Sequence, residues 1–297
     1  FECGSQAREG VSGMEGVNTM SQTAKAAQPS RSGVKSGLSA RRRAYDSGLR
    51  GLVWLCAGLT CALLLFLIGY ICYRGLPHLS WEFLTTQESL LRGTLGIRPA
   101  IYNTLYVIGV TLVIALPLGV GAAVYLTEYA TNHRLVTGIE FATETLSGIP
   151  SILYALVGYL AFSMTLGLGY SLLAASLTLA MMNLPTIIRT TQESLKTVPQ
   201  GYREGALGLG SGKWHMIRTI VLPGSIDGIV TGCILAVGRI IGESAVLLYV
   251  GGMGNSMNDF FASVDNFTHS SGATLTVQLY VFAKERAMMD PAFAVAV

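Results

Sequence analysis

Residues 100–126 read AIYNTLYVIGVTLVIALPLGVGAAVYL, and this run contains no charged side chain. The hydrocarbon core of a membrane is about 30 Å thick, so a helix needs about 20 mostly apolar residues to cross it. The run exceeds that length. Its internal proline, Pro117, would break a helix in water, but neighbouring helices in a membrane bundle satisfy the carbonyl that proline leaves free. Residues 100–126 therefore predict a kinked transmembrane helix.

Four further stretches meet the same length criterion, one before this run and three after it. They cover residues 52–73, 145–168, 171–188 and 226–250. Pro150 and Pro185 lie within two of them, where we expect kinks. Residues 293–297 look like the opening turn of a sixth span, so we expect a C-terminal helix that this sequence does not complete. The predicted fold class is all-α, a polytopic membrane helix bundle with five complete transmembrane helices plus the start of a sixth.

The composition supports this fold class. Apolar residues make up 51% of the chain and charged residues only 12%, against about 25% charged in an ordinary globular domain. The formal net charge of +3 is too small to indicate a nucleic-acid partner. Residues 1–50 are polar and contain no apolar run, so we expect a disordered cytoplasmic tail. A transmembrane domain is expected over residues 51–297.

The distribution of Lys and Arg predicts the orientation of the spans, because connections inside the cell carry an excess of these residues. With the N-terminus inside, the inner segments hold 14 of the 20 Lys and Arg residues, the outer segments hold five, and Arg239 lies within a span. We therefore expect the N-terminus in the cytoplasm and the bundle surrounded by membrane lipid.

Residues 189–223 form the longest internal connection on the predicted inner side. Pro199 suits the first turn of a helix, and residues 200–207 continue that helix with a partly apolar face. Glycines then interrupt the pattern at three alternate positions, and a second amphipathic stretch runs from Lys213 to Pro223. Two short helices joined by a glycine bend are expected to form a corner that docks into a groove on a partner protein.

A motif within this connection carries a family resemblance. Its residues, in order, are Glu204, Gly205, Ala206, Gly210, Ile220, Leu222 and Pro223. The spacing resembles the E-A-A-x3-G-x9-I-x-L-P motif of ABC-importer permeases, with a glycine in place of the first of the two alanines. The resemblance implies that these seven residues form the loop that couples the permease to a separate ATPase. Gly205 loosens the first helix by up to about 1 kcal/mol relative to alanine. The alternative is an amphipathic re-entrant loop without a partner.

The wider sequence is similar to the A-type permease of phosphate-specific ABC importers, which has a MetI-like fold, over residues 95–297. The similarity is carried by the runs AIYNTLYVI, ALPLGVGAAVYLTEYA, GIPSILYA, LPTIIRTTQESLKTVP and GRIIGES. It implies a permease domain that translocates inorganic phosphate by alternating access across a bacterial inner (plasma) membrane. The implied partners are a second, C-type permease subunit, a cytoplasmic ATPase dimer and an extracytoplasmic phosphate-binding protein. Residue chemistry alone does not select phosphate, so sulfate or molybdate, or an ion-coupled secondary transporter, stay open.

No enzymatic centre is predicted. A phosphate-binding loop needs G-x4-G-K-[ST], whose backbone N–H groups wrap the phosphates. Around Gly212 and Lys213 the leading position is Leu207 and the residue after the lysine is Trp214, so two required positions fail. The four histidines lie far apart and no two of the five cysteines have CxxC spacing, so we expect no catalytic residue, no metal and no cofactor. ATP is expected to bind to a partner subunit.

Two charges lie inside the predicted fifth span, Arg239 near its middle and Glu243 one turn further outward. Each costs about 2.5–3.5 kcal/mol at the centre of a bilayer, so each needs a reason to be there. In a continuous helix they would share one face, about 6 Å apart along the axis. One interpretation is a salt bridge that fixes helix packing. We favour a translocation site, in which Arg239 offers a forked donor to the anion and Glu243 holds or releases it.

Other polar residues near the spans have more than one interpretation. Arg189, at the inner end of the fourth span, either guides the anion out to the cytosol or anchors the span on the positive inner side. Glu140 and Glu144 precede the third span and are expected near a helix N-terminus, where carboxylates are favourable. Asn103 and Thr104 are expected to hydrogen bond to another helix rather than to substrate.

Overall fold

The computed structural model describes residues 40–89, 94–254 and 263–297. Most of the expected tail, residues 1–39, lies outside them, whereas residues 40–50 are helical and not the disordered segment that we expected. Contacts divide the chain into two units, residues 1–65 and 66–297. Helix α2, Ala40–Gly75, starts in the first unit, and 0% of its most apolar window is buried. Such a surface suits a helix in contact with lipid or with other chains.

The second unit is helical apart from one short hairpin, as far as the structure describes it. Its helical elements before the predicted coupling loop are a 3₁₀ turn at Leu76–His78, α3 (Trp81–Thr85), α4 (Arg98–Val124), a π-helical turn at Tyr125–Tyr129, α5 (His133–Ser147), α6 (Ser151–Gly158), a π-helical turn at Tyr159–Thr165, and α7 (Leu172–Thr197). Those that follow are α8 (Gln200–Gly208), α9 (Lys213–Met216), a π-helical turn at Ile217–Val221, α10 (Leu222–Gly224), α11 (Ile226–Gly242), a π-helical turn at Leu247–Gly251, α12 (Val264–His269), α13 (Leu275–Tyr280), a π-helical turn at Val281–Glu285, and α14 (Met289–Ala296).

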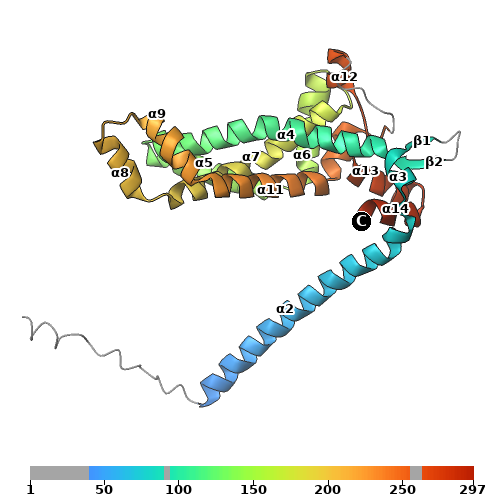
Figure 1. Cartoon of the computed structure of the whole chain (residues 1–297), viewed down its shortest axis with the longest axis horizontal. Coiled ribbons are helices and arrows are strands. Elements are labelled where there is room, and N and C mark those ends of the chain that lie inside the picture. The colour runs from blue at the N-terminus through green and yellow to red at the C-terminus, as the bar shows by residue number, and fades with distance from the viewer. Residues whose placement is uncertain (1–39, 90–93, 255–262) are drawn as a thin grey trace, which may run out of the picture. The chain divides into compact units, whose positions relative to one another are not determined.

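Helix α7 is the central helix of the second unit. It lies against both α4 and α11, and Figure 1 shows these three helices running side by side. Its buried face is rich in small residues, such as Ala174, Ala175 and Ala180, which let neighbouring backbones approach closely. At Gly158 of α6 the approach is so close that an added Cβ would lie 2.1 Å from Thr178 Oγ1 on α7. Close packing of small residues therefore builds the bundle.

The membrane-spanning helices match the predicted places. By length and composition, three helices of the described chain can each cross a membrane, and there are up to five spans if each of two bent helix pairs forms one. The span predicted at residues 52–73 lies within α2. The span at residues 100–126 covers most of α4 and the first two residues of the π-helical turn after it, and the span at residues 171–188 starts at the residue before α7. Helix α7 continues to Thr197, however, so the predicted coupling loop starts at Val198 and not at residue 189. Arg189 is consequently a helical residue.

Two predicted spans are interrupted. The chain bends by 100° between α5 and the helix that starts at Ser151, so residues 145–147 belong to a separate amphipathic helix and Pro150 does more than kink a span. The fifth span, predicted as continuous over residues 226–250, breaks at Glu243, whose backbone is extended with φ −78° and ψ 124°. The Glu243 carboxylate accepts hydrogen bonds from the N–H groups of Ala245 and Val246, at 3.0 and 3.4 Å, and so caps the next helical segment.

The end of the unit opposite α8 and α9 is built from short elements, as Figure 1 shows. Strand β1 (Gln87–Ser89) pairs antiparallel with β2 (Thr94–Ile97). Phe83, Ile97 and Phe282 form a buried cluster there, into which α14 packs. The turn predicted at residues 293–297 as the start of a sixth span lies in α14, and this helix begins earlier, at Met289.

Candidate functional site: the coupling loop and the charged residues

The predicted coupling loop has the expected form of two short helices with a glycine bend. Helix α8 ends at Gly208, and α9 starts at Lys213. Between them Gly210 has φ +82°, a conformation that residues with a Cβ rarely adopt. The bend between the two helices therefore depends on the glycine of the motif.

One side of the loop is buried against the ends of α4 and α7. Met216, Ile217 and Val221 form an apolar cluster with Ala123 and Val124 of α4. Leu195 and Val198, at the end of α7, and Ala206, from α8, complete the same cluster. The second half of the loop is thereby anchored by apolar burial to two of the spanning helices.

The other side of the loop is exposed. Of the motif residues, Glu204, Gly205, Gly210 and Pro223 are exposed, Ile220 and Leu222 are half-buried, and Ala206 is buried. Large apolar side chains lie exposed beside them, including Leu209 at 91% and Trp214 at 61% exposure. An exposed surface of this composition is compatible with the predicted docking of a partner. The loop therefore has an anchored side and a free side.

Arg203 ties α8 to the rest of the bundle. Its side chain is only 12% exposed and forms an ion pair with Glu128, at 3.1 Å, whose own side chain is 7% exposed. The same guanidinium group donates to the carbonyl oxygens of Leu195 and Val198, both at 2.7 Å. A second tie comes from α9, where Lys213 Nζ lies 5.0 Å from the centre of the Tyr129 ring.

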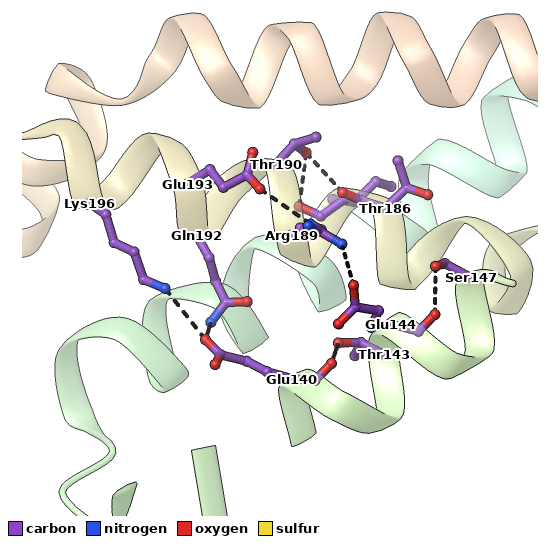
Figure 2. A network of polar contacts seen from close by, with 11 residues as sticks. Glu140, Thr143, Glu144, Ser147, Thr186, Arg189, Thr190, Gln192, Glu193 and Lys196 are labelled. Carbon is purple, nitrogen blue, oxygen red and sulfur yellow. Dashed lines mark hydrogen bonds and ion pairs between the residues drawn. The ribbon is translucent and has the colours of Figure 1, made fainter. Parts of the chain in front are cut away.

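A polar network joins α5 to α7, as Figure 2 shows. Arg189 of α7 pairs with Glu144 of α5 at 3.5 Å and with Glu193 of its own helix at 3.2 Å. One turn away, Glu140 of α5 accepts from Lys196 at 3.4 Å and from Gln192 at 3.3 Å. These side chains line a cavity of about 430 Å³. Glu140 lies at the middle of α5 and Glu144 near its C-terminal end, so the expectation that they sit near a helix N-terminus is wrong.

The two charges of the fifth span are not brought together as an ion pair. Among the described residues no hydrogen bond or salt bridge joins Arg239, on α11, to Glu243, which lies at the break after that helix. Both are partly exposed within the unit. The alternative of a packing salt bridge between them is not supported, and the translocation role stays a prediction.

Asn103 and Thr104 bind protein, as expected. The Asn103 amide donates to the carbonyl of Ala273 at 2.9 Å, and the Thr104 hydroxyl accepts from the N–H of Leu275 at 3.0 Å. Both side chains are buried. They hold the start of α13 against α4.

Sequence reasoning missed Arg203 and the acidic residues of α5 as partners. Arg203 lies 75 positions from Glu128, and the pairs between α5 and α7 are 45 to 56 positions apart. The available signal in the sequence was Arg203 itself. It lies three positions before Ala206, so a helix places this charge on the same side as that apolar residue. Within the described chain, no group of three His, Cys, Asp or Glu residues could hold a metal ion.

Several apolar spans and an anchored two-helix loop with a free face define a polytopic helical membrane protein of the permease type. The comparison with known families gives a more specific assignment. The chain belongs to the family of binding-protein-dependent transport system inner membrane components, which matches residues 115–283.

Curated relatives cover most of the chain. It is 38% identical over 212 residues to the probable ABC transporter permease protein YqgI of Bacillus subtilis (strain 168), covering 71% of this chain and 72% of that protein. It is 34% identical over 262 residues to the phosphate transport system permease protein PstA 1 of Mycobacterium tuberculosis (strain ATCC 25618 / H37Rv), covering 85% of this chain and 81% of that one.

Solved structures share the fold. A bacterial ABC transporter involved in the import of the acidic polysaccharide alginate matches with a TM-score of 0.56 and 16% identity, over 86% of this chain and 92% of that one. The inward-facing MetNI methionine ABC transporter matches with a TM-score of 0.50 and 20% identity, over 69% of this chain and 87% of that one. At these identities the likeness concerns the fold alone.

Proposed function

We propose that this chain is the permease subunit of an ATP-driven importer that translocates inorganic phosphate across the bacterial inner membrane by alternating access. The two-sided coupling loop carries the proposal. Its buried side is fixed to α4 and α7, and its exposed side presents Glu204 and Leu209 to a partner. When a partner docked on the exposed side moves, a loop of this form can transmit that movement to two spanning helices.

The proposed partner at this loop is a cytoplasmic ATPase dimer, which binds and hydrolyses the ATP. The motif residues Glu204, Gly205, Ala206, Gly210, Ile220, Leu222 and Pro223 are the proposed coupling residues. The excess of Lys and Arg on one side of the spans supports a cytoplasmic N-terminus and a cytoplasmic loop. A second permease subunit and an external binding protein complete the proposed assembly.

The substrate proposal rests on the relatives, one of which is named as a phosphate transport permease. Arg239 is proposed to contact the anion in transit, because a guanidinium group donates in the forked geometry that oxyanions accept. Glu243 and Arg189 were predicted to share this pathway. Arg189 already pairs with two carboxylates, which supports a role in holding α5 against α7 over a role in guiding the anion.

Copurification of the full-length protein from its own host tests the proposal. We expect an ATPase, a second permease and a phosphate-binding protein to be recovered with it. As a second test, a variant with Glu204→Lys and Leu209→Asp changes only the exposed side of the loop. It should stay in the membrane and lose the ATPase. Recovery with sulfate-import components would contradict phosphate as the substrate. Recovery without any ATPase would contradict the proposal that the chain belongs to an ATP-driven importer.

A further inference from the structure

Helix α8 carries the exposed half of the coupling motif, yet it is weakly held by apolar contacts. Of its residues, Gln200–Gly208, only Ala206 is a buried residue. An alanine side chain buries little apolar area, so it cannot by itself fix a helix that must bear a load. Something else has to hold α8 on the bundle.

Arg203 supplies that hold through one guanidinium group that joins α8 to two other elements. Nε and Nη2 bind Glu128 Oε1 at the end of the second span, in the π-helical turn that follows α4. Nη1 and Nη2 bind the carbonyl oxygens of Val198 and Leu195, at the end of α7. Carbonyls in the last turn of a helix have no partner within the helix, so an arginine is a favourable donor to them.

The geometry separates Arg203 from its neighbour Glu204. Successive residues of a helix point about 100° apart, so the two side chains leave α8 in different directions. The Arg203 side chain lies against the bundle and is only 12% exposed, whereas Glu204 is exposed on the docking side. One turn of α8 therefore faces the proposed ATPase on one side and both spanning helices on the other.

We infer that Arg203 is a positioning residue of the transport cycle, which transmits movement of the docked loop to the second and fourth spans by joining α8, Glu128 and the end of α7. The inference rests on the proposed function. Without this tie, the ATPase still docks on the exposed motif and hydrolyses ATP, but α8 passes less of its movement to α4 and α7, which follow it only through the apolar anchor of the loop. The specific consequence is uncoupling and not loss of docking.

The test measures import of radiolabelled inorganic phosphate and hydrolysis of ATP in vesicles that contain the full transporter with its copurified partners. Coupling between two sites is typically worth a factor of about 5 to 150. In Arg203→Ala we expect the amount of phosphate imported per ATP hydrolysed to fall by about fivefold or more. Arg134→Ala, an exposed arginine on α5 outside the loop, is the matched control and should keep the wild-type ratio.

A second variant separates transmission from folding. Arg203→Ala alone leaves Glu128 buried without its cation, which lowers the amount of folded protein. The double variant Arg203→Ala, Glu128→Ala removes the stranded charge, so the amount of assembled transporter should recover while import per ATP stays low. Recovery of both quantities would show a merely structural role and would overturn the inference.

If the double variant does not assemble, Arg203→Lys tests whether Arg203 transmits movement or only stabilises the fold. Lysine keeps a cation beside Glu128 but lacks the planar fork that reaches two carbonyls together. We expect normal assembly with reduced import per ATP, and a wild-type ratio in an assembled Arg203→Lys transporter overturns the inference. If the unmodified protein recovers no ATPase or imports no phosphate, the proposed function fails instead, whatever the Arg203 variants do.

Discussion

Arg239 is the residue on which the proposed anion pathway depends. It lies in the last turn of α11, and no described acidic side chain forms a salt bridge with it. A charge inside a membrane span is costly unless a partner offsets it. An oxyanion in transit is such a partner, and it would be present only during transport.

Substitution of Arg239 should therefore affect the transport rate. Hydrogen bonds to charged groups contribute about 1.5–3 kcal/mol, so Arg239→Ala should lower the phosphate uptake rate by about tenfold or more. Arg239→Lys keeps the charge but loses the fork, so its rate should fall between those of wild type and Arg239→Ala. Uptake is measured in cells with equal amounts of the protein in the membrane. Phosphate uptake at the wild-type rate by Arg239→Ala would contradict the hypothesis that Arg239 contacts the anion during transport.

At the scale of elements, the crossing of α6 and α7 depends on the absence of a side chain. A Cβ at Gly158 would lie within 3 Å of three side-chain atoms of Thr178, which is β-branched and cannot swing away freely. Such overpacking costs about 1–3 kcal/mol. Gly158→Ala should therefore lower the free energy of unfolding by that amount.

Gly121 is the matched control for this substitution. It lies within α4, and a Cβ there would meet nothing within 4 Å. Alanine is up to about 1 kcal/mol more favourable than glycine inside a helix, so Gly121→Ala should be neutral or stabilising. Thermal unfolding of both variants in detergent measures the difference. Equal transition temperatures would contradict the packing of α6 on α7.

Most helices could be predicted from the sequence, and their ends and breaks could not. Apolar length places α2, α4 and α7 because the lipid environment acts on every residue of a span alike. The break at Glu243 instead depends on one carboxylate that caps two N–H groups, which no hydropathy pattern contains. Helix α7 runs on to Thr197 because its polar last turns pair with α5 and with Arg203, residues that are close only in space.

The external connection was the largest omission at the element scale. No span was predicted between residue 250 and the turn at residues 293–297, yet Val277, Gln278 and Phe282 are buried. Helix α13 and the turn after it are too short to meet the length criterion for a span. Their burial follows from contacts with distant residues, such as the hydrogen bond from Gln278 to the buried Glu88 at 3.1 Å.

At the scale of the whole molecule, the candidate site divides into two parts of different predictability. The coupling loop could be predicted because its motif is local, with the bend set by Gly210 and the anchor by a short amphipathic run. The pathway residues could not be placed from the sequence. Arg189 pairs with a carboxylate of another helix, Glu243 accepts from a neighbouring backbone turn, and no salt bridge to Arg239 occurs among the described residues. Local backbone geometry can be predicted from neighbouring residues in the sequence. Ion pairs between helices depend on the tertiary fold and cannot be predicted in this way.

The energy source distinguishes an ATP-driven importer from an ion-coupled carrier. We expect phosphate accumulation by vesicles containing the assembled transporter to require ATP inside the compartment that the coupling loop faces. Collapse of the proton and sodium gradients by ionophores should leave the initial rate nearly unchanged. Vesicles loaded with a non-hydrolysable ATP analogue are the control and should accumulate no phosphate. Accumulation driven by an ion gradient without ATP would favour the secondary carrier.

The break at Glu243 has an electrical consequence for the fifth span. Each helix carries about half a positive charge at its N-terminus and half a negative charge at its C-terminus. The Glu243 carboxylate binds two amides at the positive end of the second segment, and Arg239 lies in the last turn of α11, near the negative end. Peptide dipoles thus offset part of each charge without an ion pair between them. We predict that an anion in transit offsets the rest of the guanidinium charge.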